Sequence, residues 1–229
     1  MMDNTGNSRS ITSNQTGVHE DLNKVVVKHL THEFKKPYAP FSLETFAQLN
    51  QQVIDFLAQD SSRYIILDSC CGVGESTVHL AANHPNALVI GIDKSEHRVE
   101  KIEHHLVHQV SNFIILRGDL NDLWRLIAKA EWQVKEHFLL YPNPWPKAKH
   151  LQRRWHGSAV FSSIPCIAEQ ITVRSNWSIY IDEFAEALVI AGFEPQVAEY
   201  KSDEAMTPFE RKYWASGQQS FQLTCRFNQ

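Results

Sequence analysis

The sequence of 229 residues lacks most features that mark membrane, secreted or metal-binding proteins. No apolar run approaches the roughly 20 residues that a membrane span requires. The first 20 residues are rich in Asn, Ser and Thr and lack the apolar core of a signal peptide. The four cysteines form no Cys-x-x-Cys pair, which favours reduced thiols over disulfides or zinc. We therefore expect a cytoplasmic protein with no membrane segment and no bound metal.

An overall positive charge is also absent. The formal net charge is −4, whereas a dedicated nucleic-acid binder is usually basic, so any cationic surface must be local. One local stretch exists, because no Asp or Glu occurs between His137 and Ala168. The length suits one domain with a single large core, expected over residues 21–229. We expect a monomer or a homodimer, a choice that the length does not decide. Residues 1–20 have too few apolar side chains to offset ordering entropy, which predicts a disordered tail.

Apolar stretches and helical repeats alternate through most of the chain. The spacing predicts strands at 64–69, 87–93, 112–117, 136–141, 170–175, 194–200 and 218–227. It predicts helices at 43–58, 75–83, 95–109, 120–130, 158–168 and 179–191, and a short helix or strand at 22–30. This alternation favours an α/β fold with a parallel sheet and helices on both faces. The last two strands suggest an antiparallel hairpin with a polar connection between them.

A glycine turn follows the first predicted strand. Residues 64–75, YIILDSCCGVGE, run from an apolar strand into a Gly-x-Gly turn and a helix, and Asp93 and Asp119 follow the next two strands. This is the layout of a nucleotide-binding βαβ unit, in which glycines let the backbone approach the ligand and the acid binds ribose hydroxyls. Thr77 stands where a dinucleotide fingerprint needs a third glycine, which argues against NAD or FAD. Either acid could instead cap the helix that follows it.

The most informative stretch is residues 137–154, HFLLYPNPWPKAKHLQRR. Three prolines within five residues restrict the backbone and hold Asn143 in a fixed direction beside Trp145. An amide beside an aromatic ring at a strand end can bind a planar base. The basic residues suited to phosphates are Lys147, Lys149, Arg153 and Arg154. The alternatives are a rigid structural corner and an ordinary solvated charged face.

These motifs resemble, in order, those of the bacterial tRNA (guanine-N7)-methyltransferases. The matching segments are LDSCCGVGE at 67–75, GID at 91–93, YPNPWPK at 141–147, RR at 153–154 and TPFER at 207–211. The resemblance implies a class I methyltransferase fold, which is a Rossmann-like, mostly parallel seven-stranded α/β sheet. It also implies S-adenosylmethionine as the cofactor and methylation of a guanine, position 46, in the variable loop of tRNA.

The resemblance further implies roles for individual residues. The cofactor-binding set is Asp68, Cys70, Gly72, Gly74, Asp93, Lys94, Asp119 and Asn143. The catalytic residues at the reacting base are Asn143, Trp145 and Asn176. The substrate-binding set is Lys147, Lys149, Arg153, Arg154, Thr207, Phe209, Glu210 and Arg211. The last four of these could instead form a surface turn.

Several positions depart from the family pattern, and one of them is Pro208, which replaces a residue of the 207–211 motif that is usually basic. Cys70 replaces the first glycine of the glycine motif, Asn143 replaces the acid of Pro-Asp-Pro-Trp, and Asn176 replaces the acid of Thr-Asp-Trp. A carboxylate accepts hydrogen bonds from guanine N1–H and the 2-amino group, whereas an amide offers one acceptor and one donor group. Two alternatives therefore stay open. One is a class I methyltransferase for another base, a small molecule or a protein, and the other is a cofactor- and RNA-binding homologue with weakened catalysis.

Overall fold

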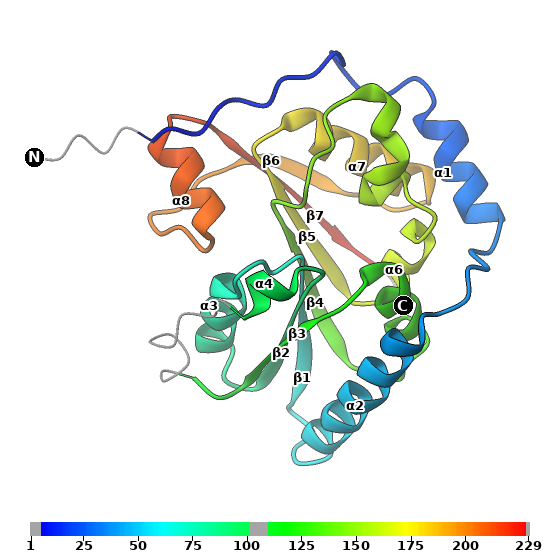
Figure 1. The fold of residues 1–229 in the computed structure, drawn as a ribbon, viewed down its shortest axis with the longest axis vertical. Helices are drawn as coiled ribbons and strands as arrows, with labels where there is room; N and C mark the ends of the chain where they lie inside the picture. The colour runs from blue at the N-terminus through cyan, green and yellow to red at the C-terminus, as the bar shows by residue number, and fades with distance from the viewer. Residues whose placement is uncertain (1–5, 101–109, 228–229) are drawn as a thin grey trace, which may run out of the picture. The chain divides into compact units, whose positions relative to one another are not determined.

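Seven strands form one sheet in the computed structural model, which describes residues 6–100 and 110–227 (Figure 1). The strands are β1 (Tyr64–Ser69), β2 (Ala87–Asp93), β3 (Phe113–Arg117), β4 (Val134–Leu140), β5 (Gln170–Ser175), β6 (Gln196–Tyr200) and β7 (Ser220–Arg226). Their order is β3-β2-β1-β4-β5-β7-β6. β1 runs parallel to β2 and β4, β2 runs parallel to β3, and β6 is antiparallel to β7. The class I, Rossmann-like α/β fold is therefore confirmed.

The helices follow the expected positions in most of the described chain. The α-helices are α1 (Leu22–Thr31), α2 (Pro40–Leu57), α3 (Glu75–Asn83), α4 (Glu96–Val99), α6 (Leu120–Ile127), α7 (Ser178–Ile190) and α8 (Pro208–Ala215). Only the start of the helix expected at 95–109 is described, as α4, because residues 101–109 lie outside the described part.

Two expectations about secondary structure are wrong. The helix expected at 158–168 is replaced by a 3₁₀ turn, η3 (Phe161–Cys166), which follows two others, η1 (Ala148–Arg153) and η2 (Trp155–Gly157). Pro165 lies inside η3 and has no backbone N–H to donate, which opposes a continuous α-helix. The connection between β6 and β7 is not only loop, because it contains α8. Thr207 caps this helix and Pro208 occupies its first turn, both of which favour a helix start.

Contacts within the chain divide it into two compact units. Among the described residues, unit 1 contains 6–34, 140–162 and 172–226, and unit 2 contains 35–100, 110–139, 163–171 and 227. The single domain expected over 21–229 stays a prediction.

Unit 2 contains the central parallel strands. β1 and β2 are almost entirely buried, as expected for parallel strands covered on both faces. α3 packs against β2 in this unit (Figure 1). Gly91 of β2 permits the close approach, because a Cβ atom there would lie 2.4 Å from Oγ1 of Thr77.

Unit 1 includes the N-terminal segment that the sequence predicts to be disordered. In the structure, residues 6–20 follow an extended path and are anchored by hydrogen bonds. The Gly6 N–H donates to the carbonyl of Ala215 at 2.8 Å, and Asn14 Oδ1 accepts from the Ala148 N–H at 3.1 Å. These contacts are made by polar groups and not by an apolar core, and the disorder expected for residues 1–20 stays a prediction.

Candidate active site

The turn after β1 has an unusual backbone. Cys70, Gly72 and Gly74 have φ angles of 62°, 61° and 81°, all in the left-handed region. Glycine adopts this region freely, whereas a residue with a Cβ is strained by about 1–2 kcal/mol. The strain at Cys70 explains why a glycine suits the position. A Cβ built on Gly72 would meet no atom within 4 Å, so open space borders the backbone there.

Asp68 is a fully buried carboxylate beneath this turn. Its Oδ2 accepts hydrogen bonds from the hydroxyls of Ser76 and Thr77, each at 2.7 Å, which tie β1 to the first turn of α3. Its Oδ1 has no hydrogen-bond partner among the described residues. Burial raises the pKa of Asp68 to about 6, although the bonds from Thr77 and Ser76 oppose the shift. The unpartnered oxygen is an acceptor available to a ligand with a donor group.

Replacing Asp68 with asparagine is expected to stabilise the ligand-free protein at high pH and to weaken cofactor binding. A carboxyl whose pKa is higher in the folded state stabilises the protein at pH values below its pKa in the unfolded state, near 4. That stabilisation is lost as the pH rises through the folded pKa, about 6. The parent therefore carries a cost at pH 8 that the variant lacks. We expect a gain of about 1–2 kcal/mol, less than the shift alone implies, because the amide keeps an imperfectly paired polar group. Urea unfolding at pH 4 and pH 8 tests this, and an equal effect at both pH values would contradict it.

Two further acids follow β2 and β3. Asp93 is buried, and it accepts from the N–H of Gly72 at 3.1 Å and of Ser95 at 2.8 Å, so it braces the glycine turn. Asp119 caps α6 by accepting from the Asn121 N–H at 3.0 Å, and Lys94 Nζ lies 3.5 Å from its Oδ2. Burial opposes ionisation of Asp119, but the bonds from Asn121 and the charge of Lys94 leave its pKa lowered. A carboxylate has about four acceptor positions, so both acids retain capacity for a ligand.

In unit 1 the proline–tryptophan turn, residues 141–146, follows the end of β4. Tyr141 and Trp145 have φ angles of 50° and 45°, and the Tyr141 N–H donates to the Arg174 carbonyl at 2.9 Å. Asn143 is exposed, and its Oδ1 accepts from the Trp145 N–H at 3.2 Å. Its amide nitrogen makes no hydrogen bond to a described residue. Asn143 therefore presents a donor group.

The basic segment divides into exposed and buried cations. Lys147, Lys149 and Arg153 are exposed, and the guanidinium of Arg153 lies 4.7 Å from the centroid of the Trp145 ring. Arg154 is fully buried, forms an ion pair with Glu183 and donates to the carbonyl of Trp145 at 3.1 Å. This placement does not fit the expected phosphate contact of Arg154, because the guanidinium is enclosed and its donors are used within the protein. The sequence offers one signal for this pair, an acid on the otherwise apolar face of α7.

Asn176 follows β5 and is partly exposed. Its amide nitrogen donates to Gln218 Oε1 at 2.8 Å. Asn176 belongs to unit 1, as do Asn143 and Trp145. Contact with one base stays a prediction for all three.

The motif at 207–211 forms the start of α8. Thr207 Oγ1 accepts from the Glu210 N–H at 3.0 Å, and buried Glu210 binds Arg174 at 2.9 Å and the Met206 N–H at 2.7 Å. Phe209 and Arg211 are exposed. Thr207 and Glu210 thus have structural partners, and substrate contact by these four residues stays a prediction.

Residues 6–100 and 110–227 contain neither a candidate metal site nor a candidate membrane span. No group of three His, Cys, Asp or Glu side chains there could hold a metal ion. In the same ranges no helix is both long and apolar enough to cross a membrane.

Comparison with known proteins identifies the family. A family model described as "Putative methyltransferase" matches residues 62–223. The chain belongs to this methyltransferase family. The tRNA (guanine-N(7)-)-methyltransferase of Jannaschia sp. is 29% identical over 188 residues, which are 80% of this chain and 77% of that protein. The protein of the same name from Cereibacter sphaeroides is 28% identical over 179 residues, covering 76% and 73%.

The fold of the methyltransferase also resembles solved structures. The 16S rRNA methyltransferase KamB superposes with a TM-score of 0.58 at 18% identity, covering 85% of this chain and 96% of that one. At this identity the likeness shows the class I fold alone.

Proposed function

We propose that the methyltransferase transfers a methyl group from S-adenosylmethionine to N7 of a guanine in tRNA, at position 46 of the variable loop. The relatives from Jannaschia and Cereibacter carry the name of this reaction. The observation that carries the proposal is the turn at 141–146, where an exposed Asn143 and a half-buried Trp145 are followed by the exposed cations Lys147, Lys149 and Arg153. These groups suit a base and its phosphates.

The residues of the glycine turn fit S-adenosylmethionine. The unpartnered, buried Oδ1 of Asp68 is an acceptor suited to a donor such as the ammonium group. The open space beside Gly72 admits a ligand close to the backbone, and Asp93 and Asp119 can accept from ribose hydroxyls. Lys94, next to Asp93, adds a donor group to these acceptors. The described acceptors therefore match the polar groups that a nucleoside with an amino-acid chain would present.

Methyl transfer to guanine N7 requires little acid–base catalysis from the protein. S-adenosylmethionine supplies a methyl group on a positively charged sulfur, and guanine N7 has an in-plane lone pair that attacks without losing a proton. The protein mainly binds and orients the base, and holding the reactants in line supplies most of the acceleration. The free amide nitrogen of Asn143 can donate to guanine O6 and leave N7 open. Trp145, positioned by Arg153 and His150, supports the turn that carries Asn143.

Removing the exposed cations is expected to weaken tRNA binding and leave the chemistry unchanged. We expect the double change Lys147→Ala and Lys149→Ala to raise the Kd for tRNA about tenfold near physiological salt and to lower the salt slope by about two. The rate at saturating tRNA should be unchanged, because neither side chain is assigned to the base. The matched control is Lys24→Ala with Lys28→Ala, two exposed lysines of α1.

Binding measured across a salt series, together with transfer of a labelled methyl group to unmodified tRNA, tests the proposal. An equal loss of tRNA affinity in both double variants would show that the basic segment is only a solvated face. Labelled transfer to protein or to a small molecule and not to tRNA would contradict the proposed function.

A further inference from the structure

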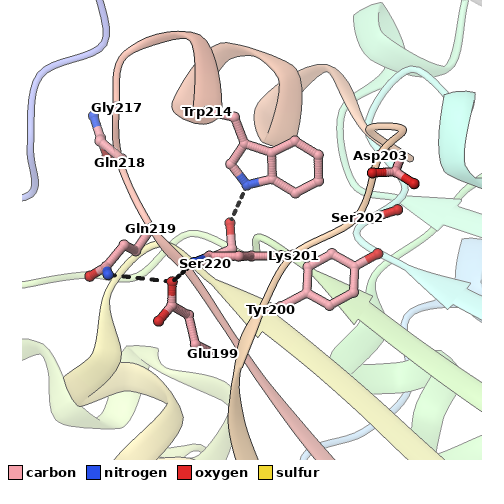
Figure 2. A pocket seen from close by; sticks show the side chains of 10 residues that line it. All are labelled: Glu199, Tyr200, Lys201, Ser202, Asp203, Trp214, Gly217, Gln218, Gln219 and Ser220. Carbon is pink, nitrogen blue, oxygen red and sulfur yellow. Dashed lines mark hydrogen bonds and ion pairs between the residues drawn. The ribbon is translucent and has the colours of Figure 1, made fainter.

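A pocket of unit 1 lies outside the motifs described above. It has a volume of about 730 Å³ and lies between the end of β6, the loop after it, the end of α8 and the start of β7 (Figure 2). The lining residues fall at 199–203, 214 and 217–220. The pocket could not be predicted from the sequence, because its two aromatic residues come from separate elements.

The pocket has a fixed aromatic wall. The ring centroids of Tyr200 and Trp214 are 6.1 Å apart, and the planes meet at 37°. The indole N–H of Trp214 donates to Ser220 Oγ at 2.9 Å (Figure 2), and the guanidinium of Arg174 lies 3.6 Å from the Tyr200 centroid. Both rings are therefore held in place before any ligand arrives. Unpaired RNA bases bind proteins by stacking on such rings.

The polar groups of the pocket favour one kind of base. Glu199 is engaged by Lys201 at 3.1 Å and by Gln219 at 3.4 Å. Asp203 is exposed and has no ion pair or hydrogen bond to a described residue, so its carboxylate is open to a ligand. Guanine presents N1–H and a 2-amino group to a carboxylate, whereas adenine presents N1 as an acceptor beside its amine.

One side chain links the pocket to the residues proposed for the target base. Gln218 lines the pocket, accepts from Asn176 at 2.8 Å and donates to the Ser8 carbonyl at 2.9 Å. Since Gln218 stands between the pocket and Asn176, an occupant would lie beside the target base and not in its place. Arg174, which holds Tyr200, also binds Glu210 of the 207–211 motif.

We propose that this pocket binds a second, unpaired guanine of the RNA substrate, close in the strand to the methylated one. The base stacks on Trp214, and its N1–H and 2-amino group donate to Asp203. This inference rests on the proposed action on RNA and adds a second point of base recognition.

Substitution of the aromatic wall tests the stacking. Trp214→Ala is expected to raise both the KM and the Kd for tRNA about tenfold, with kcat and S-adenosylmethionine affinity unchanged. Trp214→Phe keeps a ring and should stay within about twofold of the parent. Phe41→Ala, which removes a ring that is 52% exposed in unit 2, is the matched control. Parent values of KM and Kd in Trp214→Ala would overturn the inference.

A second variant tests the base preference without altering the aromatic wall. Short single-stranded RNAs of uridine with one central guanine or adenine are compared by equilibrium binding, without turnover. The parent should bind the guanine RNA about fivefold more tightly, and exposed Asp203→Asn should lose that preference. An unchanged preference in Asp203→Asn would overturn the inference alone. RNA binding that depends on Trp214 without formation of 7-methylguanosine would overturn the proposed function alone.

Discussion

Replacing Glu183 with alanine is expected to lower the free energy of unfolding by about 3–5 kcal/mol. Glu183, Arg154 and His156 are all fully buried, and Glu183 accepts from both basic residues. Glu183 Oε1 also accepts from the Gln15 side chain and from the His19 N–H at 3.0 Å. The variant leaves the Arg154 guanidinium buried without its counterion and releases an anchor of the N-terminal segment.

Two comparison variants make this result specific to the buried charge. Glu186→Ala removes an exposed acid from the same helix and should change stability by less than about 0.5 kcal/mol. The double change Glu183→Leu with Arg154→Leu should cost less than Glu183→Ala, because no unpaired charge remains. Urea unfolding measures all three variants, and a double change that costs more than the single one would contradict the account.

The same cluster predicts a pH dependence. Burial raises the pKa of Glu183, but the hydrogen bonds and charges of His156 and Arg154 dominate and lower it to about 2. A carboxyl whose pKa is lower in the folded state stabilises the protein at pH values above its pKa in the unfolded state, near 4.5. That stabilisation is lost as the pH falls toward the folded pKa. The stability difference between parent and Glu183→Ala should therefore shrink between pH 5 and pH 3. A difference that stays constant over this range would contradict the assignment.

Replacing Asp93 with alanine is expected to weaken S-adenosylmethionine binding at least about 100-fold. Each hydrogen bond lost to a ribose hydroxyl costs about 1–3 kcal/mol if the partner stays buried. The change also removes the acceptor for the Gly72 N–H, so the glycine turn loses a brace. Calorimetry with the variant measures the loss, and Asp55→Ala, an exposed acid of the same unit, is the control.

A ligand comparison separates ribose recognition from damage to the turn. The parent should bind S-adenosylhomocysteine more tightly than its 2′-deoxy form, and Asp93→Ala should bind the two almost equally. Damage to the turn alone would weaken both ligands and preserve their ratio. A preserved ratio would therefore assign Asp93 a structural role only.

The strands of the sheet could be predicted well, because the local pattern of apolar residues and turn signals sets where they begin and end. The bounds of β1, β2, β5 and α3 match the predicted ranges, and for β1 and β2 the reason is that buried parallel strands have largely apolar sequences between turn signals. The glycine turn was recognised for the same reason. Thr207 and Pro208 are start signals of α8, but the polar composition of this segment favours a connection without a helix.

Roles that depend on distant partners could not be predicted. Lys149 and Arg154 look alike in a basic run, yet one is exposed and the other is paired with Glu183, far along the chain. Nothing in the local pattern distinguishes them. The pocket shows the same limit, because Tyr200 ends β6 and Trp214 lies in α8. The hydrogen bonds of residues 6–20 likewise join them to polar partners elsewhere in unit 1.

Methyl transfer to a tRNA transcript with guanine at position 46, compared with the same transcript carrying 7-deazaguanine there, tests the central claim most directly. The second base has carbon in place of N7 and keeps the Watson–Crick edge of guanine. The proposed function predicts 7-methylguanosine in the first transcript and no methylation of the second. Equal methylation of both transcripts, or methylation of neither, would contradict it.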